Sequence, residues 1–353
     1  MSELDQVLPH FQRGRLEYGG GFSNHGPMAA EALEVLGHAA LIPALADVYI
    51  PRLGILEAGE VIPRDKRRES LGNGADADWV ATFCHGVEEA SWEQVLAEWL
   101  PELLPGLFAA AGHGLLRTAH AVRAVRKSAT RPRIQEVAYG LGYWASRYQV
   151  LPGQPGSAPV EGRSPAAWVE SISPLAAEER TGTFFSESVQ VLEGRIDFVE
   201  GVASIDLDGH QDLESISLLS AVAAGRYLEN PDEKVALAHG VTLPSAVRLL
   251  APELKDFDLR RAVGFATQAV GALVMIRGAS GVGASDPVDE KIRRLAEEDA
   301  EMRYVAACSA EEHAIKLCEA CLREDAVASD PRLRWAAAHA ALRMGVSAGA
   351  RGA

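Results

Sequence analysis

The feature that most constrains the fold is a helical periodicity that runs through most of the 353 residues. Apolar residues recur at spacings of three and four, and alanine and leucine are abundant, as in amphipathic α-helices. The segments with this spacing are 27–38, 91–111, 114–128, 186–200, 210–228, 256–277, 309–324 and 331–344. Alternating β-branched stretches are nearly absent, and 197–209 is the best strand candidate. We therefore expect an all-α protein: a large multi-helix domain with long irregular loops and little or no sheet.

Local signals indicate where several helices begin. Two serines match a capping box, in which Glu or Gln follows three residues later: Ser91 with Gln94 and Ser309 with Glu312. Pro231, after Asn230, suits the first position of a helix that ends at Gly240.

Two stretches, 51–78 and 151–166, break the helical pattern with glycine, proline and charge. We expect a single helical domain over 1–353. Within it, 151–166 fits either a linker between two domains or a loop that covers a pocket, and the sequence leaves both readings open.

The charge balance disfavours nucleic acid and anionic membrane as partners. Lys and Arg number 34 against 49 Asp and Glu, so the formal net charge is −15. The one basic stretch, 117–133, spreads its charges over several sides of a helix and is interpreted as a solvated helical surface. No apolar run approaches the roughly 18 residues of a membrane span, and the polar, acidic start is unlike a signal peptide. We expect a cytoplasmic protein.

The four cysteines do not form a disulfide framework in a chain of this length. Cys318 and Cys321 make a CxxC, but it lies inside a helical pattern and has no second CxxC. Small buried thiols in a reducing compartment are the expected reading.

Most common catalytic motifs are missing. The sequence has no GxGxxG after a strand, no phosphate-binding GxxxxGK[ST], no GxSxG and no HExxH. Glu-x-x-His is also absent, which disfavours a di-iron carboxylate bundle despite the helical class.

Four of the ten histidines lie at helix edges in distinctive local frames. His25 precedes a helix begun by Pro27, and His113 lies in GHGL at another helix start. His239 ends the helix begun at Pro231, and His313 lies in the first turns of the helix that Ser309 caps. A lone histidine is usually a surface or core residue, but a set on rigid helix edges can hold iron or zinc.

Two further residues lie close to these histidines. Thr242 is placed to cap the helix that follows His239. Lys316 falls in a helical-wheel sector with Glu312, Glu319 and Arg323, so periodicity favours an exposed lysine in an ion pair with Glu312.

Together these frames resemble the questin oxidase-like family, and the chain looks like a bacterial relative of its fungal members. The segments that carry the resemblance are SNHGPMAAEALEVLG (23–37), GHGLLRTAHAVRA (112–124), AHGVTLPSAVRLL (238–250) and EEHAIKLCEACL (311–322). They occur in order and span nearly the whole chain. Arg117 and His120 follow His113 on the same helix face within the second segment, with no role assigned.

The resemblance implies an oxygenase that inserts oxygen into, or cleaves, anthraquinone-type aromatic polyketides in Baeyer–Villiger-like chemistry. It implies a mononuclear non-haem Fe²⁺ site, O₂ as co-substrate and NADPH as a candidate reductant. The implied ligands are His25, His113, His239, His313 and a carboxylated lysine, Lys316. An anionic ligand would offset the buried charge of the ion, and this role requires Lys316 to face inward.

The sequence leaves roles for two neighbours and two other functions open. Asn24 and Thr242 would give hydrogen bonds that support the ligands. The same histidines suit a zinc- or manganese-dependent helical hydrolase, and dispersed histidines would suit a non-catalytic helical binding protein.

Overall fold

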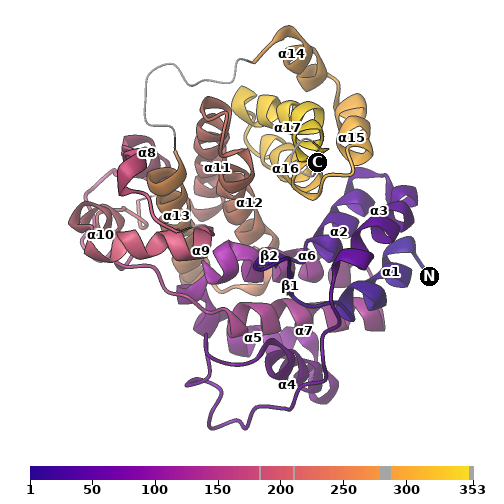
Figure 1. Ribbon diagram of the computed structural model, residues 1–353. Helices are drawn as coiled ribbons and strands as arrows, with labels where there is room; N and C mark the ends of the chain where they lie inside the picture. The colour runs from indigo at the N-terminus through magenta and orange to yellow at the C-terminus, as the bar shows by residue number, and fades with distance from the viewer. Residues whose placement is uncertain (183, 210, 279–287, 350–353) are drawn as a thin grey trace. The chain divides into compact units, whose positions relative to one another are not determined.

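The computed structural model describes residues 1–182, 184–209, 211–278 and 288–349, and helices dominate them (Figure 1). Within these ranges the chain forms seventeen α-helices, several short 3₁₀ turns and one two-stranded sheet. The sheet pairs β1 (Glu17–Tyr18) antiparallel with β2 (Phe22–Ser23). The all-α prediction is confirmed. The strand candidate at 197–209 is wrong, because α10 (Ile196–Ala203) fills most of it.

The chain divides into two compact units, each made of two stretches of sequence. The first unit comprises Met1–Val150 and Leu249–Asp258, and the second comprises Leu151–Arg248 and Leu259–Ala353. The irregular segment 151–166 opens the second unit and runs without regular structure to the start of α8 (Pro165–Ser171).

The first unit contains seven helices among its described residues. They are α1 (Glu3–Gln12), α2 (Gly26–Leu36), α3 (Ile42–Tyr49), α4 (Asp76–Glu89), α5 (Trp92–Leu103), α6 (His113–Lys127) and α7 (Arg131–Ser146). Helix α7 packs against α1, α4, α5 and α6, while α2 packs against α1, α3 and α6.

Helices α6 and α7 cross closely because each has a glycine at the crossing. A Cβ on Gly114 would lie 2.5 Å from the Cα of Trp144, and a Cβ on Gly140 would lie 2.7 Å from the Cα of Thr118. No side chain fits at those separations. The crossing therefore fixes the first turn of α6, where His113 lies.

The second unit is built around long apolar helices. Besides α8 and α10, its helices are α9 (Phe185–Ser188), α11 (Asp212–Glu229), α12 (Lys234–Leu250), α13 (Asp256–Arg277), α14 (Glu290–Glu297), α15 (Asp299–Cys308), α16 (Glu312–Asp325) and α17 (Pro331–Gly349). Helix α17 packs against α11, α14, α15 and α16. In α13 every residue from Ala262 to Ile276 is buried.

Two helices are long and apolar enough to cross a membrane by length and composition alone: Lys234–Glu253 and Asp256–Arg277. Their apolar windows are 67% and 83% buried inside the protein. Core helices of this length meet the same criterion, so the finding does not decide where the protein resides.

The predicted helix starts have mixed outcomes. The capping box at Ser91 is confirmed, since its Oγ accepts from the Gln94 N–H at 3.3 Å and the Gln94 side chain accepts from the Ser91 N–H at 3.1 Å. The box at Ser309 is wrong. Ser309 ends α15, and the carboxylate of Glu311 caps α16 by accepting from the Ala314 N–H at 2.6 Å. The helix expected at 186–200 is broken into α9, a 3₁₀ segment (Val189–Gly194) and α10.

The predicted stop at Gly240 is also wrong. Helix α12 continues through Gly240 to Leu250, so Thr242 lies inside a helix and does not cap one. Gly240 fits there because the Ala223 methyl group lies only 3.2 Å from where its Cβ would be. Close packing, not chain termination, explains this glycine.

The prediction of a solvated surface at 117–133 fails for two of its arginines. Arg117 and Arg133 are only 1% and 2% exposed. Arg133 Nε pairs with Asp5 at 2.7 Å, and Arg117 Nε pairs with Glu136 at 2.6 Å. The partners lie on other helices, which the charge pattern of one helix does not reveal.

The prediction that the two CxxC cysteines are small buried thiols is confirmed. Cys318 and Cys321 are fully buried free thiols in α16. Burial raises the pKa of Cys318 to about 12 and the pKa of Cys321 well above its ordinary value. Both therefore behave as small apolar side chains.

Candidate metal centre

His25 immediately precedes α2 and is held by its neighbours. The Asn24 amide donates to the carbonyl oxygens of Phe11 and Arg15, both at 3.3 Å, and its Oδ1 accepts from the Gly26 N–H at 3.2 Å. The His25 N–H itself donates to the buried Tyr49 hydroxyl at 2.8 Å. These contacts fix the backbone of a histidine that is 4% exposed.

His113 begins α6 after a turn of left-handed residues. Ala110, Ala111 and Gly112 have φ values of 50°, 56° and 86°. Left-handed alanines are unfavourable, so the surrounding structure imposes this turn. It brings the Ala110 carbonyl oxygen to 2.5 Å from His113 Nδ1. A carbonyl only accepts, so Nδ1 carries the proton and Nε2 carries a lone pair.

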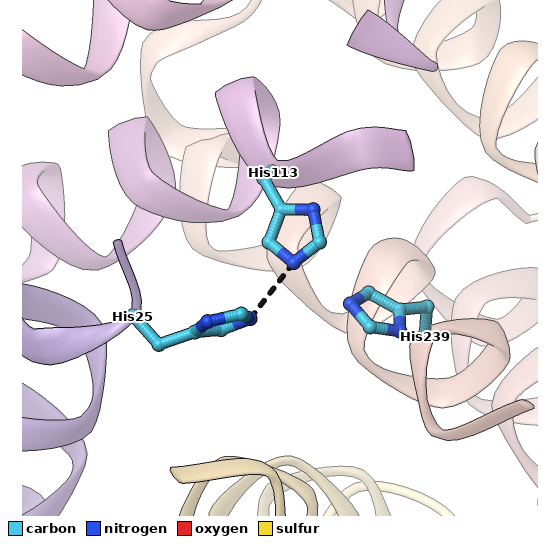
Figure 2. A group of neighbouring side chains, drawn as sticks. All are labelled: His25, His113 and His239. Atoms are coloured by element: carbon cyan, nitrogen blue, oxygen red, sulfur yellow. Dashed lines mark hydrogen bonds between the residues drawn. The ribbon is translucent and has the colours of Figure 1, made fainter. Parts of the chain in front are cut away.

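The two imidazoles of the first unit meet directly, as the dashed line in Figure 2 shows. Nε2 of His25 and Nε2 of His113 are 2.9 Å apart, and the rings are nearly perpendicular at 85°. With the proton of His113 on Nδ1, His25 donates from Nε2 in this arrangement. Ligation of one ion by both rings requires His25 to carry its proton on Nδ1 instead.

In the second unit, His239 lies in α12 and is also labelled in Figure 2. Its Nδ1 donates to the Val235 carbonyl oxygen, one helical turn earlier, at 2.9 Å. Burial, with added repulsion from His313 and Lys316, lowers the pKa of His239 to about 3. The ring is therefore neutral at physiological pH, which is the form that binds metals.

His313 lies beside His239, with ring centroids 5.7 Å apart. Its Nδ1 contacts the Glu311 carboxylate at 2.8 Å, an arrangement common behind metal-bound histidines. Burial would raise the pKa of Glu311, but His313 and the Ala314 N–H outweigh it and lower that pKa. Glu311, Glu312 and His313 have ligand atoms within 4.8 Å of one another, so this group can hold a metal ion.

Lys316 is 2% exposed, so the periodicity-based prediction of an exposed lysine is wrong. The wheel placed Lys316 beside Glu319, which is also buried, at 3%. Burial lowers the pKa of Lys316 to about 8, although Glu312 and Glu311 partly offset this effect. Lys316 is therefore covered by other parts of the protein, and it lies near enough to His239 to contribute to the lowered pKa of that histidine.

The two proposed supporting residues have different surroundings. Asn24 is fully buried, and the hydrogen bonds described above tie it to backbone around His25. Thr242 is 7% exposed and lies three residues after His239 in α12.

Three supporting groups were missed by the sequence analysis: the Tyr49 hydroxyl, the Ala110 carbonyl and the Glu311 carboxylate. Only Glu311 had a local signal, since it lies two residues before His313.

Of the six remaining histidines, three make ordinary contacts with neighbouring side chains. His85 is exposed and lies 3.3 Å from Glu89, and His339 contacts the Tyr227 hydroxyl at 2.8 Å. His120 Nδ1 lies 2.7 Å from Glu31, within a buried ionic cluster. His210 lies outside the described residues.

Comparison with known proteins adds no assignment. No protein-family profile matches the chain, and no curated protein matches its sequence. The family resemblance therefore depends on the four quoted motifs, and the metal-binding capacity depends on the histidine and glutamate groups described above.

Proposed function

We propose that the chain is a non-haem iron-dependent oxygenase that inserts oxygen into, or cleaves, anthraquinone-type aromatic polyketides. His25, His113, His239 and His313 would be the imidazole ligands of the ion. Lys316, as its carbamate, would be the fifth ligand. The proposal combines the motif resemblance with the hydrogen bonding of the histidines.

One observation carries the metal site: three of the four histidines have Nδ1 bound to an oxygen. The partners are the Ala110 carbonyl for His113, the Val235 carbonyl for His239 and the Glu311 carboxylate for His313. Such partners hold the proton on Nδ1, orient the ring and leave the Nε2 lone pair for a metal. Low exposure favours ligation further, because water does not compete for the ring nitrogens.

The charge of the ligand set explains the part given to Lys316. Four neutral imidazoles leave the double positive charge of a ferrous ion uncompensated in a buried site. The neutral amine of Lys316 adds CO₂ and releases a proton. The product is a carbamate, which supplies an anionic oxygen ligand. A buried lysine is suited to this because burial disfavours its ammonium form.

A bound ferrous ion would supply the one-electron chemistry that reaction with O₂ requires. The chain's own residues would orient the ligands: Asn24 fixes the backbone at His25, and the Ala110 and Val235 carbonyls fix two imidazole rings. Thr242 would give a supporting hydrogen bond in α12. NADPH is the candidate reductant.

Metal analysis of protein purified without chelators tests the site. We expect about one iron per chain in the wild type, and a loss of most of it in both His113→Ala and His239→Ala. His85→Ala, which changes an exposed histidine, should keep the wild-type metal content. A His239→Ala variant that retains its metal would show that His239 is not a ligand.

Oxygen uptake with a panel of hydroxyanthraquinones tests the reaction. Uptake that depends on iron and on His113 supports the oxygenase. Bound zinc or manganese with hydrolysis and no oxygen uptake would favour the metal-dependent hydrolase instead. A protein that binds no metal under any condition is neither enzyme, and a helical binding protein would then be the better reading.

A further inference from the structure

A second polar cluster lies inside the first unit, among helices α1, α2, α6 and α7. It surrounds a small cavity with about 10 Å³ of room for the centre of a water molecule. The residues around it include Glu31, Arg117, His120 and Glu136, together with apolar residues such as Leu8 and Met28. None of these side chains belongs to the proposed metal ligands.

Arg117 is the unusual member of this lining. Its side chain is fully buried, Nε donates to Glu136 at 2.6 Å, and its guanidinium lies 5.5 Å from the centre of the Tyr139 ring. Both terminal amino groups, Nη1 and Nη2, have no hydrogen-bond acceptor among the described residues. A buried donor without an acceptor costs about 1–3 kcal/mol, and more when it is charged. Such a group therefore indicates a ligand.

Charge and size decide what that ligand is. Arg117 is balanced by Glu136, and Arg123 is balanced by Glu31 at 2.7 Å, so an added anion would lie beside two carboxylates without a free positive charge. The room available is close to the roughly 10–15 Å³ that a single water needs, and it is too small for a larger anion.

We propose that this cavity is a binding site for one internal water molecule, which accepts hydrogen bonds from the terminal amino groups of Arg117. The same water has acceptors nearby. The Glu136 carboxylate accepts hydrogen bonds from Arg117 Nε and from the Gln12 amide, the latter at 3.1 Å. A carboxylate can accept about four hydrogen bonds, so two of these positions remain for the water. A buried water with two to four polar partners is a stable part of a protein structure.

The site has a structural consequence for the two histidine-bearing helices of this unit. Glu31 of α2 already binds His120 and Arg123 of α6, and Arg117 of α6 binds Glu136 of α7. The water completes the hydrogen bonding of the buried ionic groups between these helices. It thereby helps fix the separation of α2, which follows His25, from α6, which begins at His113.

A high-resolution crystal structure of the full chain, with a parallel bromide soak, tests the inference on the unaltered protein. We expect a water peak within hydrogen-bond distance of Arg117 Nη1 or Nη2 that bromide does not replace. The absence of a peak at both amino groups overturns the proposal, and so does an anomalous bromide peak there.

A solution experiment tests the same point independently of crystals. Magnetic relaxation dispersion of water counts long-lived internal water molecules. Arg117→Met should show one fewer than the wild type, whereas Arg126→Met, at a half-exposed position of the same helix, should show no change. An unchanged count in a folded Arg117→Met variant contradicts the proposal. If that variant does not fold, the crystal experiment on the wild type decides.

Discussion

The Nδ1 atom of His113 lies 2.5 Å from the carbonyl oxygen of Ala110, across a turn in which three successive residues have positive φ. The turn is unfavourable for its two alanines, at about 1–2 kcal/mol each. The strain is located where a ring nitrogen must be oriented, which is the pattern expected when strain supports a functional site.

Ala111→Gly should therefore stabilise the protein by about 0.5–1 kcal/mol. Glycine removes the left-handed strain, although its freer unfolded chain cancels part of the gain. Urea unfolding measures the effect. The matched control is Ala109→Gly, at a buried residue of the same turn without positive φ, which should lose about 1–2 kcal/mol. Destabilisation by Ala111→Gly as well would contradict the strained turn.

Gly114→Ala should destabilise the protein by about 2 kcal/mol or more, because the new methyl group would lie 2.5 Å from the Trp144 backbone. Helices α6 and α7 must then separate. Gly86→Ala is the matched control on α4, where the nearest atom is Val95 Cγ2 at 3.7 Å. It should be neutral or stabilising by up to about 1 kcal/mol, since alanine favours the helix. Equal losses in chemical denaturation would argue against the close crossing.

A comparison of α13 with α7 shows what sequence periodicity can and cannot predict. The periodicity predicted 256–277, which matches α13 at both ends, because that helix is apolar along most of its length. It did not single out α7, where Gly140 and Gly142 interrupt the pattern. Those glycines are present because other helices approach there, and such contacts leave no local signal.

Some features of the candidate site could likewise be predicted from the sequence, and others could not. The sequence singles out His25, His113, His239 and His313 by their local frames, but the helix signals were correct only at His25 and His113. The stop expected after His239 and the cap expected before His313 are wrong. The burial of Lys316 could not be predicted from the sequence, because the helical wheel counts only the charged neighbours on the same helix. Burial depends on which elements cover that face, and Glu319 is covered together with it. Tyr49 supports His25 from 24 residues away, which no local pattern encodes.

Stability should fall in acid partly because of Glu31. Burial alone would raise the pKa of this carboxyl, but Arg123 and His120 outweigh it and lower the pKa from 4.5 to about 2. A carboxyl with a lower pKa in the folded state stabilises the fold above its unfolded pKa. This contribution, roughly 3 kcal/mol, is lost as the pH falls from about 4.5 to 2.

Urea unfolding of wild type and Glu31→Gln at several pH values measures this contribution. Near pH 6 the variant should be less stable by about 3–5 kcal/mol, because Arg123 loses its buried partner. The difference should narrow steadily below pH 4.5. A difference that stays constant down to pH 2 would mean that Glu31 is not held ionised by its neighbours.

Metal removal should destabilise the wild type and leave a ligand variant unchanged. A ligand that binds only the folded state stabilises it by about 2.7 kcal/mol at 100 times its dissociation constant. We therefore expect a chelator to lower the thermal midpoint of the wild type and added Fe²⁺ under nitrogen to restore it. His113→Ala should melt at the same temperature with and without chelator, because a lost ligand abolishes the linkage. His85→Ala should respond as the wild type does, since its side chain is exposed and pairs with Glu89. A chelator effect of equal size in His113→Ala would place the metal elsewhere in the chain, and the histidine set proposed above would then be wrong.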